Sequence, residues 1–377
     1  MWLGLDDTDH LKGGCTTLEF HKLLEALPCS YSRPRLVRLW PFAAQRTRGN
    51  AALAVELSCD EGIIPFLDEY WHRVLLPLRG AISPSHHNDR EQHPADPGMV
   101  LFTEQPAADY YWRAVRQEVR DIPQAVKSWG GHGRIGASAA CAWPAIMHTW
   151  EAIAWRVNER KVDAMALAKV DSWPETFLCR DPRSKRGLIA PRGPCPVMFG
   201  IRATTEQIAS KAATLLITAK DTAAVIASRT FATNQASGDH IECSFTTKVC
   251  TVTTLKGGHT TIETERDNLV SFSAGADMNR LAQWLQRGDE IEYLGLQDRE
   301  GVIHLEALKL LSATGKQRPT CVCGKRMKSM GKGQGVRCPK CKITQDQQWI
   351  FTDREPPSTG WTQPPFDCRR HLARQIV

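Results

Sequence analysis

Four cysteines near the C-terminus constrain the fold of this 377-residue chain more than any other feature of its sequence. They form two pairs, Cys321 with Cys323 and Cys338 with Cys341. Four thiolates from two such pairs are the ligand set of a tetrahedral structural zinc site. The C-x-C gap of the first pair is shorter than usual, and Cys368 with His371 provides a spare pair that could substitute. We therefore expect a zinc ribbon with an architectural role.

The rest of the composition indicates a soluble protein of several domains. The chain has 13 cysteines and no secretory leader at its N-terminus, which favours reduced thiols and a cytoplasmic location. No apolar run reaches the ~18–20 residues of a membrane span, so no membrane association is expected. At ~150 residues per domain, the length predicts two to three domains, or four small ones.

Positive charge is concentrated at the end of the chain. Residues 313–377 carry 13 Lys and Arg against 4 Asp and Glu, a net charge of +9, whereas the preceding residues have a net charge of −2. A polyanion is the natural partner for such a segment, and nucleic acid fits both the charge and the predicted ribbon. A solvated tail that only improves solubility is the alternative interpretation.

The N-terminal segment carries the strongest signal for catalysis. A short apolar strand, 2–5, ends in the acidic run Asp6-Asp7-Thr8-Asp9, and Gly14 then leads into a helix that begins near Thr16 or Thr17. We expect one of these threonines to cap the helix, with Glu19 completing a capping box. Clustered carboxylates repel one another unless a divalent cation, typically Mg²⁺, binds between them. The helix N-terminus favours phosphate, although an acidic turn that merely caps the helix would look the same.

Further along the chain, patterns predict a mixed architecture. Strands are expected at 35–40, 51–57 and 197–201, and a helix at 205–216. Arg46 and Arg48 flank a glycine turn before Asn50, an arrangement that suits phosphate binding. From about residue 241 the alternation becomes all-β, which favours a small barrel, with the oligonucleotide-binding fold as the leading candidate.

Taken in order, these segments resemble the archaeal-type tRNA 2-agmatinylcytidine synthetases. The resemblance covers nearly the whole chain, and the ordered set of motifs is specific although each motif is short. The motifs that carry it are Gly4–Asp9 with Gly14–Thr17, Arg46–Ala51, Asp96–Gly98, Gly133–Ala137, Ala190–Pro194, Phe199–Arg202, Phe231–Gln235, Asp239–His240 and the zinc ribbon.

The resemblance implies an α+β multidomain fold with four parts. These are a kinase-like α/β catalytic domain over 1–115, a ferredoxin-like domain over 116–236, an OB-fold β-barrel over 237–312, and a zinc ribbon with a basic tail over 313–377. It also implies the reaction, in which ATP drives the joining of agmatine to C2 of the wobble cytidine in the CAU anticodon of isoleucine tRNA. The modified tRNA then reads AUA in place of AUG. No obligate protein partner is implied.

The family's site residues transfer to this sequence motif by motif. The resemblance implies that Asp6, Asp7 and Asp9 handle ATP with Mg²⁺, and that Thr16 becomes phosphorylated. It implies ATP or phosphate binding by Gly14, Thr17, Arg46, Arg48 and Asn50, and substrate binding by Gly133, Arg192, Gly193, Asn234, Gln235 and Asp239. Zn²⁺ is expected on Cys321, Cys323, Cys338 and Cys341.

Three alternatives stay open on the sequence alone. Cys195 stands where the family tends to have Asp, so the same ligase chemistry could use a different amine. The chain could instead be a non-catalytic protein that binds structured RNA through its barrel and ribbon. A kinase of a small molecule or protein, with no role for RNA, is the third.

Overall fold

The computed structural model divides into two compact units. It describes residues 1–9, 14–46, 50–80, 85–87, 90–191, 193, 195–313, 315–346, 348–351 and 354–376. Unit 1 comprises Met1–Glu242, Gln297–Glu300 and Arg369–Gln375. Unit 2 comprises Cys243–Leu296, Gly301–Cys368 and Ile376–Val377. None of the described helices is both long and apolar enough to cross a lipid bilayer.

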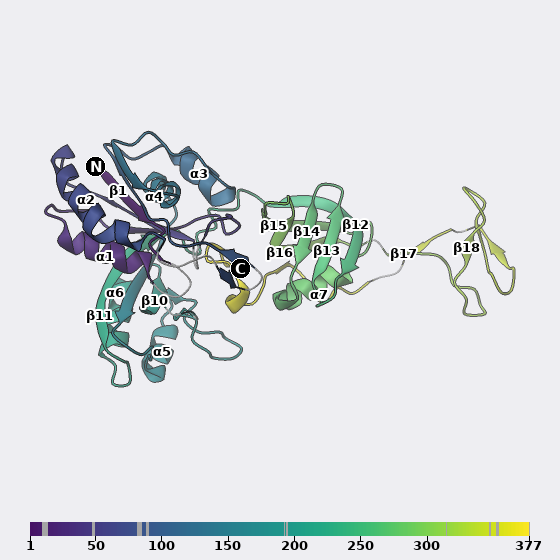
Figure 1. The fold of residues 1–377 in the computed structure, drawn as a ribbon. Helices are drawn as coiled ribbons and strands as arrows, with labels where there is room; N and C mark the ends of the chain where they lie inside the picture. Colours follow the sequence, from purple (N-terminus) through teal and green to yellow (C-terminus); the bar gives the residue numbers. More distant parts are fainter. Residues whose placement is uncertain are drawn as a thin grey trace. The chain divides into compact units, whose positions relative to one another are not determined.

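Unit 1 is built on one nine-stranded sheet (Figure 1). Its strands, in spatial order, are β7 (Lys127–Gly130), β6 (Gly98–Phe102), β1 (Trp2–Asp6), β3 (Ala51–Glu56), β2 (Arg35–Arg38), β11 (Val225–Thr233), β8 (Thr149–Arg156), β10 (Val197–Ala203) and β9 (Thr176–Phe177). Neighbouring strands are antiparallel except β2 and β11, which pair in parallel over only two residue pairs. This short seam joins a five-stranded half to a four-stranded half. A separate hairpin pairs β4 (Ser85–His87) with β5 (Arg90–Gln92).

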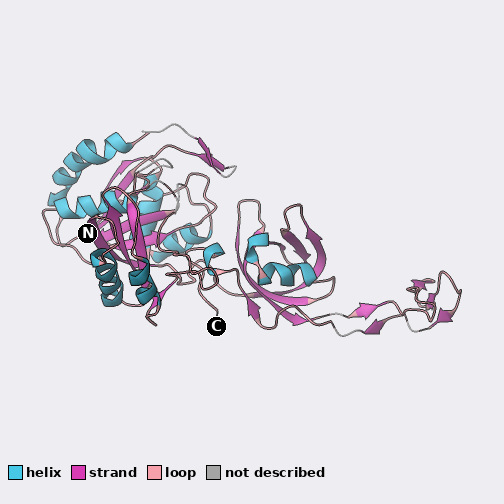
Figure 2. Ribbon diagram, turned by 90° about the horizontal axis from the view of Figure 1, so that it is seen from below, coloured by secondary structure: helices cyan, strands magenta, loops and turns pink. Residues whose placement is uncertain are grey.

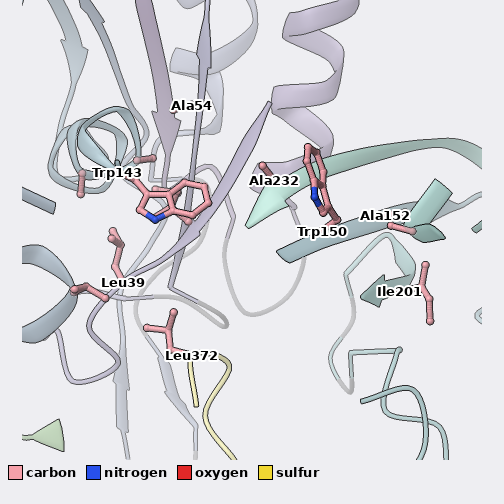
Figure 3. Packing of buried hydrophobic residues seen from close by; sticks show 14 of the residues in the cluster. Leu39, Ala54, Trp143, Trp150, Ala152, Ile201, Ala232 and Leu372 are labelled. Atoms are coloured by element: carbon pink, nitrogen blue, oxygen red, sulfur yellow. The ribbon is translucent and has the colours of Figure 1, made fainter. Parts of the chain in front are cut away.

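Helices cover both faces of the sheet, and the side-chain alternation of the strands explains why (Figure 2). On β1 and β3, the large residues Leu3, Leu5, Leu53 and Val55 point to one face, where they pack in a core with Phe20 and other apolar residues of the covering helices. The helices whose buried residues join this core are α1 (Thr16–Ala26) and α2 (Ile64–Tyr70). The other face is covered by α3 (Ala108–Arg116), α4 (Gly133–Ala142), α5 (Ala164–Asp171) and α6 (Glu206–Thr218). Figure 3 shows part of this second core.

Glycines let α4 approach the sheet unusually closely. A Cβ atom on Gly4 of β1 would lie 2.4 Å from the carbonyl oxygen of Ala137, and one on Gly136 would lie 1.9 Å from the carboxylate of Asp6. At Gly98, the nearest atom to such a Cβ is the backbone nitrogen of Arg134, at 1.9 Å. The glycine-rich start of α4 therefore serves close helix–sheet packing and places the first turn of this helix against the end of β1.

Unit 2 contains a closed β-barrel. Its strands are β12 (Phe245–Thr254), β13 (Thr260–Thr264), β14 (Asn268–Ser271), β15 (Glu290–Gln297) and β16 (Ile303–Ser312), and β14 pairs with β16 to close the sheet. Helix α7 (Asp277–Trp284) lies between β14 and β15 in the chain and packs its Met278 and Leu281 into the barrel core. The short strand β22 (Trp361–Thr362) pairs antiparallel with β16.

The ribbon follows the barrel in the chain and has little regular structure. Three short strands form one sheet: β18 (Lys328–Ser329), β19 (Val336–Arg337) and β20 (Thr344–Gln345). Strands β17 (Lys316–Gln317) and β21 (Ile350–Phe351) pair with each other. The core of the ribbon consists of Met327, Val336 and three of the cysteines. So small a core indicates that the ribbon depends on a metal for its stability.

Most elements expected from the sequence are present. The predicted strands at 2–5, 35–40, 51–57 and 197–201 correspond to β1, β2, β3 and β10, and the predicted helix at 205–216 corresponds to α6. A mixed α+β fold of several parts is confirmed. The predicted boundary at 115/116 falls at the last residue of α3, and β7 beyond it belongs to the same sheet as β1. The division into four domains stays a prediction, because the structure groups residues 1–242 in one unit.

The close contact at Gly98 predicts a large loss of stability when a methyl group is added. Gly98→Ala is expected to destabilise unit 1 by about 3 kcal/mol, because the new Cβ meets backbone that cannot move without displacing α4. Gly187→Ala is the matched control, since its Cβ would meet only the end of the Leu167 side chain, at 3.0 Å. Urea unfolding of both variants measures the difference. Equal stability of the two variants would contradict the proposed role of Gly98.

Candidate functional site

The acidic loop at the end of β1 is held in a tight, unusual conformation. Asp7 adopts a left-handed backbone conformation, with φ of 59°, which Asp tolerates better than most residues. Its backbone N–H donates to Asp6 Oδ1 at 2.7 Å. Its own carboxylate accepts from the backbone N–H of Asp96 at 3.3 Å. The loop therefore directs two consecutive carboxylates into the same small volume.

Electrostatic conflict in this loop is strong. Burial raises the pKa of Asp6 well above its usual value, and the negative charge of Asp9 adds to this effect. Burial, together with the charges of Asp6, Asp9 and Asp96, raises the pKa of Asp7 to about 9. A divalent cation would remove this penalty, and carboxylate oxygens are the ligands that Mg²⁺ prefers. These residues fit a metal–phosphate site.

Thr16 is tied to the acidic loop, and the predicted capping box is wrong. The residue at the N-cap of α1 is Cys15, whose side chain makes no capping hydrogen bond, and Glu19 pairs instead with Lys22 at 2.8 Å. Thr16 is the first residue of the helix, and its hydroxyl donates to Asp9 Oδ1 at 3.4 Å. The hydroxyl also accepts from the backbone N–H of Thr8 at 3.3 Å. The hydroxyl of Thr16 is therefore held against the acidic loop by two hydrogen bonds.

Two neighbouring residues fix this arrangement. Gly14 has φ of +70°, and a Cβ there would lie 2.9 Å from the Cα of Asp9, so the turn requires glycine. The hydroxyl of Thr17 accepts from Trp155 Nε1 at 3.2 Å and contacts Cys15 Sγ at 3.0 Å. Thr17 thus anchors the start of α1 to the second half of the sheet.

Two cavities open beside the loop, both within unit 1. The first, here called the Asp7 cavity, measures about 60 Å³ and is lined by Asp6, Asp7, Arg46 and Asn50 together with the start of α4. The second, the Thr16 cavity, measures about 290 Å³ and is lined by Asp9, Thr16, Thr17 and Asn50 on one side. Asn50 lines both cavities, and its side chain donates to the carbonyl oxygen of Trp40 at 2.5 Å.

A buried charged cluster that the sequence did not reveal forms the other wall of the Thr16 cavity. Glu151 lies 3.6 Å from Arg202 Nε and 4.0 Å from Arg38 Nη2, and it accepts a hydrogen bond from Gln235. Gly200 makes room for it, because a Cβ there would lie 2.3 Å from a Glu151 oxygen. These side chains come from β2, β8 and β10, so no local motif could have linked them to Asp9.

Three predicted substrate-binding residues use their side chains within the protein. Asn234 bonds to the backbone N–H and carbonyl of Arg38, at 2.8 and 2.9 Å. Gln235 donates to Glu151, and Asp239 accepts from Tyr111 Oη at 2.9 Å. The structure therefore does not bring them to the lining of either cavity. Asn234 and Gln235 hold Arg38 and Glu151, which do line the Thr16 cavity.

The other predicted binding residues lie in or near glycine-containing loops. Gly133 begins α4, and a Cβ there would lie 2.6 Å from the carbonyl oxygen of Asp6. The carbonyl of Gly193 accepts from Arg160 Nη2 at 3.1 Å. Arg48 and Arg192 lie outside the described residues, so their expected roles stay predictions.

The four ribbon cysteines form a metal site. Their sulfur atoms all lie within 4.8 Å of one another, and those of Cys323 and Cys338 are 3.5 Å apart. A tetrahedral Zn²⁺ with Zn–S bonds of ~2.3 Å requires S–S distances of about 3.8 Å. The backbone N–H of Cys341 holds the pKa of Cys338 at about 6, which favours the thiolate. His371 belongs to unit 1 and does not replace a cysteine in this group.

The raised pKa of Asp7 predicts a stability that falls with pH when divalent cations are absent. The folded state holds a proton on Asp7 up to about pH 9, whereas the unfolded state loses it near pH 3.8. Stability therefore declines between these values, and Asp7→Asn is expected to remove part of the decline, adding at least ~1 kcal/mol at pH 8. Thermal unfolding from pH 5 to 9 without Mg²⁺ measures this, with Asp221→Asn as control. A variant that parallels wild type across this range would contradict the assignment.

The zinc assignment predicts a specific loss of metal. Cys338→Ser is expected to lower bound zinc from about one ion per chain to almost none, because the three thiolates that remain no longer complete the site. Cys368→Ser, which changes an exposed cysteine outside the cluster, should retain full zinc. Elemental analysis of dialysed protein measures both. Zinc loss from Cys368→Ser would instead support a ligand set that includes the spare pair.

Three segments of the chain match known protein families. Residues 2–70 match the TiaS TCKD domain, residues 131–240 match the TiaS FLD domain, and residues 318–353 match the TiaS C-terminal zinc ribbon domain.

Similar proteins match over most of the chain. The isoleucine tRNA 2-agmatinylcytidine synthetase TiaS of Pyrobaculum neutrophilum is 33% identical, over 90% of this chain and 86% of its own length. Its counterpart in Methanosarcina mazei is 29% identical, over 100% of this chain and 97% of its own. A crystal structure of TiaS in complex with its isoleucine tRNA and ATP is 25% identical, covers 100% of this chain and 97% of that one, and superposes with a TM-score of 0.76. By sequence and by fold, this chain belongs to the TiaS family of isoleucine tRNA 2-agmatinylcytidine synthetases.

Proposed function

We propose that this chain uses ATP to attach agmatine to C2 of the wobble cytidine of the minor, CAU-anticodon isoleucine tRNA, as its TiaS relatives are named for doing. One observation in the structure carries the chemistry. The hydroxyl of Thr16 is bonded to Asp9, Thr16 lines one cavity, and Asp6 and Asp7 of the same acidic loop line the neighbouring one. Such a site suits phosphoryl transfer, and the C2 oxygen of cytosine leaves readily only after it has been phosphorylated.

Asp6 and Asp7 are the proposed ligands of Mg²⁺. Burial raises the pKa of both groups, the charge of Asp9 adds to the effect on Asp6, and the charge of Asp6 adds to the effect on Asp7. These shifts support the role, because a bound cation stabilises the ionised carboxylates. When bound there, Mg²⁺ would neutralise the phosphate oxygens of ATP. The same pair would be unfavourable in a site without a cation.

Asp9 and Thr16 are the proposed pair for phosphoryl transfer. Thr16 Oγ1 would attack the terminal phosphorus of ATP, the bond from that phosphorus to the bridging oxygen would break, and ADP would leave. The proton of the hydroxyl would pass to Asp9 Oδ1, which already accepts a hydrogen bond from it at 3.4 Å. Such an activated hydroxyl follows the general pattern of a nucleophile beside a base.

Phosphate binding is proposed for residues around the loop. Arg46 and Asn50 line the Asp7 cavity, and Asn50 with Thr17 lines the Thr16 cavity. A nucleotide bound along the acidic loop would therefore contact both cavities. Gly14 permits the turn between the acidic loop and α1. Arg48 is expected to add a second guanidinium to that of Arg46.

For the substrates, we propose two kinds of role. Asn234 and Gln235 position the wall of the Thr16 cavity, since their side chains bond to Arg38 and Glu151. Asp239 acts one step further away, because it accepts from Tyr111, which itself bonds to Asn234. Arg192 and Gly193, which follow the lining residue Pro191 in the sequence, and Gly133 at the start of α4 stay proposed substrate contacts. The wobble base would have to leave the anticodon stack to reach the site, as base-modifying enzymes require.

The finer domain assignments are also proposals. The spatial order of the barrel strands is β12-β13-β14-β16-β15, and the pairing of β12 with β15 closes the barrel. Along the chain, helix α7 lies between the third strand, β14, and the fourth, β15. This topology supports an OB-fold, a fold that commonly binds oligonucleotides. The two halves of the large sheet support the kinase-like and ferredoxin-like labels. A cytoplasmic location follows from the substrates, tRNA and ATP.

Transfer of labelled agmatine tests the function directly. With ATP and Mg²⁺, the label should join a CAU-anticodon isoleucine tRNA transcript and not a transcript whose wobble C is changed to U. ATP cleavage stimulated by the tRNA without transfer of label would indicate a different amine. Absence of both transfer and cleavage would favour the non-catalytic RNA-binding alternative.

Thr16 provides the sharpest test of the mechanism. Thr16→Ala should lower agmatine transfer by at least about 10³-fold, since no hydroxyl remains to accept the phosphoryl group. Thr16→Ser keeps the hydroxyl and should stay within about tenfold of wild type. Initial rates at saturating tRNA measure both variants. If Thr16→Ala kept wild-type activity, the proposed role of this hydroxyl would be wrong.

A further inference from the structure

A histidine from the last part of the chain lies in the Thr16 cavity. His371 belongs to residues 369–375, which fold with unit 1 although unit 2 precedes them in the chain. The backbone N–H of Ala236 donates to the carbonyl oxygen of His371 at 2.8 Å, and that of Gly238 to the carbonyl of Leu372 at 2.9 Å. Leu372 is only 3% exposed and joins the second core of the sheet (Figure 3). The segment 369–375 is therefore a fixed part of unit 1.

The imidazole of His371 is available to a ligand. Its side chain faces the open space of the cavity, and within the described part of the chain it makes no hydrogen bond to another protein group. The guanidinium of Arg38 holds the pKa of His371 well below its usual value, and burial within the protein and Arg202 act in the same direction. The ring is therefore neutral at physiological pH while the cavity is empty of anions.

Positive charge exceeds negative charge on this wall of the cavity. Arg38 and Arg202 both lie within ion-pair distance of the Glu151 carboxylate, and the side chains of Arg202 and Glu151 are at most 10% exposed. The Nε of Arg202 is buried without a hydrogen bond among the described residues. A buried donor of this kind calls for an acceptor. Asp9, which already accepts from Thr16, lies on the other wall.

We propose that His371, together with Arg38 and Arg202, binds the phosphoryl group that Thr16 carries during the reaction. The proposal rests on the function proposed for Thr16, and it gives the opposite wall of the same cavity the role of binding the phosphoryl group. Phosphoryl oxygens accept hydrogen bonds from guanidinium groups and from a protonated imidazole. The cationic substrate agmatine would be repelled by the two arginines, so this wall suits the phosphoryl group better.

The first test uses inorganic phosphate as the probe and does not require Thr16 to be phosphorylated. In full-length protein with ¹⁵N-labelled histidine, His371→Gln identifies the resonance of His371. Millimolar phosphate should raise the pKa of His371 by about one pH unit or more, because a nearby dianion stabilises the imidazolium. Gln375→Ala, an exposed change in the same segment, should respond as wild type does. A His371 titration that phosphate leaves unchanged would overturn the proposal.

The second test follows the phosphorylated protein. After incubation with γ-labelled ATP and Mg²⁺, hydrolysis of the label on Thr16 should be at least about fivefold faster in His371→Gln than in wild type or Gln375→Ala, since a contact that holds the phosphoryl group has been lost. Equal hydrolysis rates would contradict the proposal. Equal melting temperatures of the variants would exclude a difference in folding as the cause.

The two tests separate the two ideas. If Thr16 takes no label but phosphate raises the pKa of His371, the role of Thr16 fails and the anion-binding wall stands. Suppose instead that Thr16 is labelled, that phosphate leaves the pKa of His371 unchanged, and that His371→Gln leaves the hydrolysis rate unchanged. The function of Thr16 then stands and the role of His371 fails.

Discussion

The parallel pairing of β2 with β11, only two residue pairs long, is the contact on which the site depends. One half of the sheet supplies Asp9 and Thr16, and the other half supplies Glu151 and Arg202. The cavity between them exists because the two halves are joined at this seam. The charged cluster reinforces the seam, since removing one partner of a buried ion pair leaves an uncompensated charge that costs roughly 3–5 kcal/mol. Arg38 of β2 and Glu151 of β8 thus link the halves electrostatically as well.

Close packing around β1 explains why the protein can hold clustered carboxylates. Helix α4 approaches the strand through Gly133 and Gly136, and the carboxylate of Asp6 occupies space that a side chain on Gly136 would fill. The loop is therefore confined by backbone and cannot relax by spreading its charges apart. Stability is given up locally for a fixed arrangement of anionic ligands, which is a common property of functional sites.

The sequence predicted what depends on local pattern. The apolar run before Asp6, the alternation in 51–57 and the spacing of the four cysteines each arise from neighbouring residues, and the structure contains the expected strands and metal group. The cap of α1 was mispredicted because the hydroxyl of Thr16 has a competing partner, Asp9, seven residues earlier.

Residues distant in the chain set the rest of the site. Arg38, Glu151, Arg202 and His371 come from four separate segments, and nothing near any of them signals the others. The spacing of Cys368 and His371 had allowed a different role for the histidine, as a substitute zinc ligand. Helix α7 was missed within a stretch that otherwise reads as all-β, although its buried residues Met278, Leu281 and Ala282 follow helical spacing.

The return of residues 369–375 to unit 1 has a consequence for biosynthesis. The ribosome completes the large sheet, the barrel and the ribbon before it makes the segment that contributes Leu372 to the core and His371 to the cavity. A nascent chain can therefore fold most of unit 1 early and still lack one wall of its site. A chain that stops before residue 369 would contain the large sheet, the barrel and the ribbon but would lack the wall that His371 gives to the Thr16 cavity.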